Sequence, residues 1–243
     1  MSLDNTSRTD RLNPSTYQTR FNPFRTRLNP PTNTFDSAPV LKLDSVSCVR
    51  GARKLFSGIT QSVAPGELLR VQGPNGAGKT SLLRMLCGLL APTEGHVLWR
   101  GEKLGAQRDV FGHDLVYLGH AAALKDELSP LENLLDACAL GGHPTDTAAA
   151  LAALRAAGLR GHERTVARRL SQGQRRRSAL ARLALCPAAP LWVLDEPFNA
   201  LDVAATAWLS GLIEAHLQRA GMVVLTSHQD VALSAGQQQV LKL

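Results

Sequence analysis

Short apolar runs, separated by glycine and proline turns, begin at Val40 and continue to the end of the chain. Alternating apolar and polar positions over 41–49 and 58–63 predict two β-strands, and the run 68–72 predicts a third strand that leads into a glycine-rich loop. Apolar residues at helical spacing predict a helix over 79–90, which Pro92 ends. A further strand is predicted over 96–99.

The second half of the chain continues this alternation. Residues 110–180 have mainly helical patterns, including an alanine-rich helix over 147–157. A fully apolar strand over 191–194 follows, then a helix over 203–219 and strands over 222–226 and 240–243. Strands that alternate with helices are typical of a parallel sheet, so the pattern predicts an α/β fold. We expect one domain over 39–243, with residues of about 110–180 as an inserted helical subdomain.

Residues 1–38 differ from the rest of the chain. They are rich in Ser, Thr, Asn, Pro and Arg, show no hydrophobic periodicity and repeat the pattern Arg-x-Asn-Pro at 11–14, 20–23 and 27–30. Such a composition predicts a disordered N-terminal extension. Both an inert leader and a tail that docks on a partner or a membrane remain open.

Composition narrows the class of protein. The 243 residues are 44% hydrophobic, enough for one sizeable core. No apolar run approaches the roughly 20 residues that cross a bilayer, and the N-terminal segment lacks the apolar stretch of a secretory signal. We therefore expect a protein kept in the cytoplasm. The four cysteines (Cys48, Cys87, Cys138 and Cys186) form no Cys-x-x-Cys pair, and we expect them to be reduced and buried.

The net charge of +7 is compatible with nucleic acid or with an anionic membrane surface as a partner. Aromatic residues make up only 5% of the chain, and no nucleic-acid recognition motif is present. Nucleic acid is therefore not an expected partner.

The glycine-rich loop Gly73–Thr80 carries the first candidate chemistry. It fits the pattern G-x-x-x-x-G-K-T and lies between a predicted strand and a predicted helix, as a phosphate-binding loop does. Its backbone N–H groups would wrap the phosphates of a nucleotide. We expect Lys79 to bind the β- and γ-phosphates and Thr80 to bind Mg²⁺. The expected nucleotide-binding residues are Gly73, Pro74, Asn75, Gly76, Ala77, Gly78, Lys79, Thr80 and Ser81.

Two adjacent acids end the apolar strand 191–194. Asp195 and Glu196 should therefore emerge at the carboxyl edge of a central strand, beside the phosphate loop. We expect Asp195 to bind Mg²⁺ through its water shell, and Glu196 to polarise the water that attacks the γ-phosphate.

Five segments, in this order, carry a resemblance to a known family: the phosphate loop, 170–174 (LSQGQ), 194–197 (LDEP), 199–202 (NALD) and 226–228 (TSH). Together they resemble the nucleotide-binding domain of ATP-binding cassette (ABC) transporters over about residues 40–243. The resemblance implies a P-loop NTPase fold, with a RecA-like core, an antiparallel β-subdomain and an inserted helical subdomain. It also implies ATP and Mg²⁺ as cofactors.

In that family two such domains pack head to tail, with ATP between the phosphate loop of one and the LSQGQ segment of the other. The resemblance thus implies a second copy of this chain as a partner. Ser171, Gly173 and Gln174 would contact a nucleotide that the partner copy binds. His228 would sense the γ-phosphate and would act with Glu196 and Lys79 in catalysis.

The chain departs from the family at two positions. The family usually has a glutamine near the start of the helical subdomain, where this chain has Ala121, and we hypothesise that His120 or a water molecule takes its place. Many members also stack the adenine on an aromatic residue. That position falls near Arg50, whose guanidinium can stack on a base as well.

Three further segments (117–120, 124–134 and 170–177) resemble one branch of the family, the ATP-binding export proteins of cytochrome c biogenesis, which are haem exporter ATPases. The branch implies a peripheral protein at the cytoplasmic face of the bacterial inner membrane, with integral membrane permease subunits as partners. Its work would be haem export or ATP-driven release of a haem-loaded chaperone. Two alternatives remain: an ABC ATPase that exports lipid, drug or ion, and a non-transport ABC protein.

Overall fold

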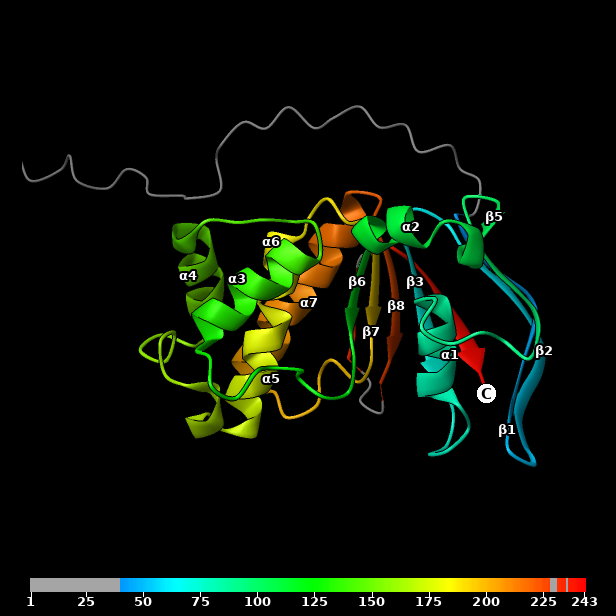
Figure 1. The fold of residues 1–243 in the computed structure, drawn as a ribbon, viewed down its shortest axis with the longest axis horizontal. Helices are drawn as coiled ribbons and strands as arrows, with labels where there is room; N and C mark the ends of the chain where they lie inside the picture. The colour runs from blue at the N-terminus through cyan, green and yellow to red at the C-terminus, as the bar shows by residue number, and fades with distance from the viewer. Residues whose placement is uncertain (1–39, 228–230, 235) are drawn as a thin grey trace, which may run out of the picture. The chain divides into compact units, whose positions relative to one another are not determined.

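A five-stranded parallel sheet with the strand order β6-β7-β8-β3-β9 lies at the centre of the fold (Figure 1). The computed structural model describes residues 40–227, 231–234 and 236–243, without the side chains of residues 108 and 109. The disorder expected for 1–38 and the role expected of His228 lie outside the described residues. The strands are β3 (Glu67–Gln72), β6 (Leu115–Leu118), β7 (Leu191–Leu194), β8 (Met222–Thr226) and β9 (Gln237–Lys242).

The central strands β7 and β8 are buried along their whole length. Along β7, Leu191 and Val193 pack into one core cluster, whereas Trp192 and Leu194 pack into the other. Successive side chains of a strand point to opposite faces, so a strand covered on both sides needs an uninterrupted apolar run. This explains why 191–194 contains no polar position.

An antiparallel sheet, ordered β2-β1-β4-β5, covers one side. Its strands are β1 (Leu41–Arg50), β2 (Arg53–Val63), β4 (Glu94–Trp99) and β5 (Glu102–Lys103). Helix α1 (Lys79–Leu86) lies between the two sheets in Figure 1 and buries four apolar side chains in their common core cluster: Leu82, Leu83, Met85 and Leu86.

Helices cover the other side of the parallel sheet (Figure 1). They are α3 (Pro130–Leu140), α4 (Thr147–Ala156), α5 (Gln172–Leu180), α6 (Arg182–Leu185) and α7 (Val203–Gln218), with a 3-10 turn at Ala167–Arg169. Helix α2 (Arg108–Asp114) follows another such turn at Leu104–Ala106. A capping box begins α5, because the Ser171 hydroxyl accepts a hydrogen bond from the N–H of Gln174 and the Gln174 side chain accepts one from the N–H of Ser171.

The structure confirms the expected P-loop ABC fold and corrects four of the expected elements. Strand β6 was missed inside the stretch expected to be helical, because four residues directly after a short helix show no clear period. Helix α1 ends at Leu86 rather than at residue 90, since Gly88 adopts a left-handed conformation with φ of +68°. Strands β2 and β9 begin earlier than predicted, at Arg53 and Gln237.

The four cysteines are buried and free, as expected. Within the described ranges, we find no helix with the length and apolar character needed to cross a membrane.

A buried histidine makes the stability of this fold depend on pH. His216 of α7 is 1% exposed and stacks on Trp192, with the ring centroids 3.8 Å apart. Burial, together with the charge of Arg219, lowers the pKa of His216 to about 4. The unfolded chain therefore takes up this proton first as the pH falls below about 6.5. The free energy of unfolding that neutral His216 contributes is fully present above that pH and is lost as the pH falls from about 6.5 to about 4.

We therefore expect the free energy of unfolding to fall by roughly 3 kcal/mol between pH 7 and pH 4 through this one group. Urea unfolding at several pH values measures it. A His216→Phe variant keeps a ring against Trp192 and should lose clearly less stability over the same range. An equal loss in both proteins would contradict the assignment.

Candidate functional site

The loop between β3 and α1 has a backbone that only glycine adopts easily at three of its positions. Gly73, Gly76 and Gly78 have φ values of +154°, +80° and +107°. A Cβ at Gly73 would lie 2.8 Å from the carbonyl oxygen of Leu243, and one at Gly78 would lie 3.0 Å from the ring of Phe56. The loop is therefore fixed by close packing as well as by its own sequence.

The side chain of Lys79 folds back over this loop. Its Nζ donates hydrogen bonds to the carbonyl oxygens of Gly73, at 2.7 Å, and Pro74, at 3.2 Å. The residue is 9% exposed, so a nearly buried positive charge lies at the N-terminus of α1. This combination of an ammonium group and a helix N-terminus favours phosphate.

Two threonine hydroxyls hold the carboxylate of Asp195. Thr80 Oγ1 donates to Asp195 Oδ2 at 2.9 Å, and Thr226 Oγ1 donates to Asp195 Oδ1 at 2.7 Å. The two threonines come from α1 and from the end of β8. A hydroxyl and a carboxylate oxygen side by side form a hard, all-oxygen donor set, so Thr80 and Asp195 fit Mg²⁺.

The backbone at Glu196 is held in an unusual conformation. Its φ of +52° lies in the left-handed region, which non-glycine residues rarely adopt. Its N–H donates to Thr226 Oγ1 at 2.9 Å, and the residue is 7% exposed. Thr226 thus orients both acids, although the sequence pattern singled it out only as part of the segment 226–228.

Lys79, Thr80, Asp195 and Glu196 line a cavity of about 520 Å³. Of the predicted site residues, eight line it: Asn75, Gly76, Gly78, Lys79, Thr80, Ser81, Asp195 and Glu196. Gly73 and Pro74 contribute through the carbonyls that bind Lys79, and Ala77 does not line the cavity. Leu55, which was not an expected site residue, is also at its wall, and so is Asn199, which the sequence indicated only as part of the segment 199–202.

The predicted LSQGQ residues lie elsewhere on the chain. Among the described residues that line the phosphate cavity, none comes from 170–174. Gly173 instead packs against the segment that follows Glu196, where a Cβ would approach the carbonyl oxygen of Ala200 to 2.9 Å. Ser171 and Gln174 use their side chains in the capping box of α5. His228 is outside the described residues.

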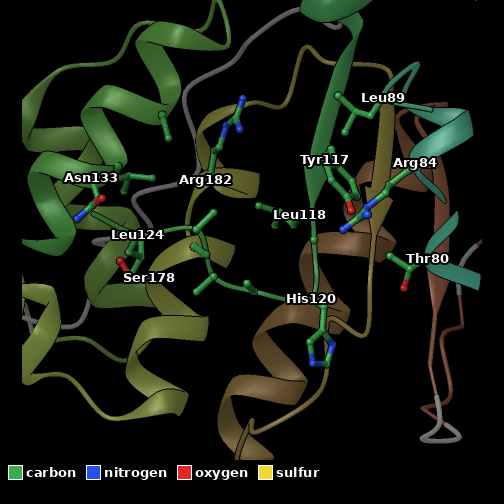
Figure 2. A pocket seen from close by; sticks show the side chains of 17 residues that line it. Thr80, Arg84, Leu89, Tyr117, Leu118, His120, Leu124, Asn133, Ser178 and Arg182 are labelled. Carbon is green, nitrogen blue, oxygen red and sulfur yellow. The ribbon is translucent and has the colours of Figure 1, made fainter. Parts of the chain in front are cut away.

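A second cavity of about 530 Å³ adjoins the first and extends toward α3 and α5 (Figure 2). Both cavities share Thr80 and His120. Ala121 also lines the second cavity, next to His120. In Figure 2 the His120 ring extends from the chain that follows Leu118, so this histidine lies where the two cavities meet.

The hairpin formed by β1 and β2 contains Arg50, near which the adenine-stacking position was expected, but it places a different arginine over the loop. The guanidinium of Arg53 comes within 3.7 Å of the position of a Cβ at Gly76. Arg50, the residue suggested by the sequence, pairs with Arg53 at the end of the hairpin and is exposed.

Comparison with known proteins shows the family to which the chain belongs. Residues 56–199 match the family model described as ABC transporter. The chain is 53% identical to the cytochrome c biogenesis ATP-binding export protein CcmA of Dechloromonas aromatica, over 84% of this chain and 100% of that protein. It is 47% identical to the CcmA of Nitrosospira multiformis, over 84% of this chain and 99% of that protein.

Among solved structures, a dimeric bacterial ABC transporter cassette, MJ0796, is similar to the chain. The TM-score is 0.72 at 24% identity, covering 83% of this chain and 94% of the other. This likeness supports the fold.

The role of Thr226 can be tested by removing its hydroxyl. A Thr226→Val variant keeps the shape but leaves Asp195 Oδ1 and the N–H of Glu196 without this partner in a buried site. We expect the free energy of unfolding to fall by about 1–3 kcal/mol. Urea denaturation measures it, and Thr226→Ser, which keeps the hydroxyl, is the control. A Val variant as stable as the Ser variant would contradict this role.

Proposed function

Because the chain belongs to the ABC transporter family and, within it, to the ATP-binding export proteins of cytochrome c biogenesis, we propose that it hydrolyses ATP to drive haem export in c-type cytochrome biogenesis. One observation carries the ATPase assignment: the hydroxyls of Thr80 and Thr226 hold Asp195 beside the phosphate loop, and Thr226 also fixes Glu196. The export role rests on the relatives, one of which is matched by this chain over 100% of the relative's own length.

Each residue of the cavity has a part in hydrolysis. Lys79 exchanges the carbonyls of Gly73 and Pro74 for oxygens of the β- and γ-phosphates, and the loop N–H groups bind the remaining charge. Thr80 and Asp195 would hold Mg²⁺, which neutralises charge on the phosphates when bound. Glu196 accepts a hydrogen bond from the attacking water and then its proton.

The position of the LSQGQ segment supports pairing of two copies. Ser171, Gly173 and Gln174 do not line the phosphate cavity of their own chain, yet they begin a nine-residue helix whose N-terminal N–H groups suit an anion. In a head-to-tail pair they complete the ATP site of the second copy. His228, which directly follows Ser227 after β8, would sense the γ-phosphate there.

The second cavity suits a role in coupling to membrane permease subunits. It shares Thr80 and His120 with the phosphate cavity, so a protein segment docked there would touch residues next to the nucleotide. His120 then stands in for the glutamine that Ala121 replaces. In this arrangement the chain is a peripheral protein at the cytoplasmic face of the inner membrane.

Loss of the catalytic carboxylate should stop both ATP hydrolysis and the formation of holo-cytochrome c. A Glu196→Gln variant keeps the size of the side chain but cannot accept the proton of water, so we expect MgATP turnover of the assembled complex to fall at least 100-fold. A strain that carries only this variant should lack holo-cytochrome c, as measured by haem staining. Lys79→Ala should likewise abolish turnover.

Two outcomes would separate the parts of this proposal. Normal holo-cytochrome c in the Glu196→Gln strain would contradict the haem role and leave the ATPase intact. Unchanged turnover in Lys79→Ala would contradict the ATPase itself.

The role of His120 gives a further prediction. A His120→Ala variant should bind MgATP as the wild type does, because the loop and Lys79 are unchanged, but the permease should no longer stimulate its turnover. The ratio of turnover with permease to turnover without it measures this. His162→Ala, at an exposed position, is the control. Stimulation equal to that of the wild type would show that His120 takes no part in coupling.

A further inference from the structure

One buried arginine joins the helix that begins within LSQGQ to the ends of two sheet strands. Arg176 lies in α5 and is 6% exposed. Its Nη1 donates to the carbonyl oxygens of Gly119, at 2.7 Å, and His120, at 3.3 Å. Its Nη2 donates to those of Asp195, at 2.6 Å, and Glu196, at 2.9 Å. One planar side chain thus connects α5 with the carboxyl ends of β6 and β7.

The neighbours of Arg176 in sequence behave differently. Arg175 forms an ion pair with Asp126 at 2.6 Å, and Arg177 forms one with Asp202 at 3.3 Å. Arg176 instead turns inward and donates hydrogen bonds to four backbone carbonyl oxygens. Burial lowers the pKa of Arg176, and the negative charges of Asp195 and Glu196 oppose this shift. A guanidinium can serve two strand ends at once because its donors form a rigid fork.

The contact with Glu196 matters because the backbone there is strained. The left-handed conformation, with φ of +52°, persists only if the surroundings hold it. The Thr226 hydroxyl binds the N–H of Glu196. The carbonyl oxygen of Glu196 accepts hydrogen bonds from Arg176 Nη2 and, at 3.2 Å, from the N–H of Asn199. Arg176 therefore contributes a link to this arrangement from α5, outside the sheet and the turn that follows it.

We propose that Arg176 is a positioning residue for ATP hydrolysis: it holds the backbone of Glu196 so that the carboxylate points at the attacking water. It does so from the helix that begins with LSQGQ, so this segment and Glu196 move together. The inference rests on the ATPase function and the head-to-tail pairing proposed above. In such a pair, LSQGQ touches the partner's ATP, so Arg176 connects the nucleotide contact at one site with the carboxylate at the other.

The test is an Arg176→Lys variant of the full chain in its complex. Lysine keeps the positive charge, but its single nitrogen cannot span the carbonyls of both strand ends. We expect kcat for MgATP hydrolysis to fall at least tenfold while KM stays within threefold, because the phosphate loop is untouched. Arg175→Lys, the same change one position earlier in the same helix, is the control and should stay within twofold of the wild type in both constants.

Three results of this test would overturn the proposal. The first is a kcat equal to that of the wild type. The second is a rise in KM that accounts for the whole effect. The third is loss of ATP binding or of cooperative unfolding, because Arg176 would then support the fold rather than position Glu196. A wild-type complex that does not hydrolyse ATP would instead contradict the proposed function.

A double variant tests whether Arg176 acts through Glu196. In the Glu196→Gln background the carboxylate is already absent, so adding Arg176→Lys should change the residual single-turnover rate by less than twofold. A further tenfold loss would overturn the proposal, because the two residues would then contribute independently.

Discussion

The carboxylate of Asp195, held between the hydroxyls of Thr80 and Thr226, is the interaction on which the rest of the site depends. It joins three elements that are far apart in sequence: the helix after the phosphate loop and the ends of β7 and β8. The sheet order makes this contact possible, because β8 lies directly between β7 and β3. The loop that follows β3 and the acids that follow β7 therefore emerge at the same edge.

At the same edge of the sheet, the site contacts helix α5 and the second cavity. The carbonyl groups of Gly119 and His120 directly follow β6, and those of Asp195 and Glu196 directly follow β7. Arg176 donates hydrogen bonds to all four. His120 also lines both cavities. If Arg176 positions Glu196 as proposed, a shift of α5 moves both the backbone of Glu196 and the backbone of His120 at the second cavity through this one side chain.

Much of this architecture could be predicted from the sequence, because local patterns determine it. The apolar run 191–194 predicted a central strand, and the phosphate loop predicted both its own conformation and the helix after it. Strand β6 was not predictable, since four residues carry little periodicity. Thr226 and Arg176 were missed for another reason: their importance comes from contacts with residues distant in sequence, and no single-chain pattern shows which polar side chain will meet which backbone carbonyl.

A structure of the Glu196→Gln chain with MgATP would test the account most directly. We predict two copies, with each nucleotide between the phosphate loop of one copy and Ser171 and Gly173 of the other, and with Asp195 beside the Mg²⁺ site. A nucleotide bound by one copy alone, with the LSQGQ segment of every copy away from the phosphates, would contradict the account.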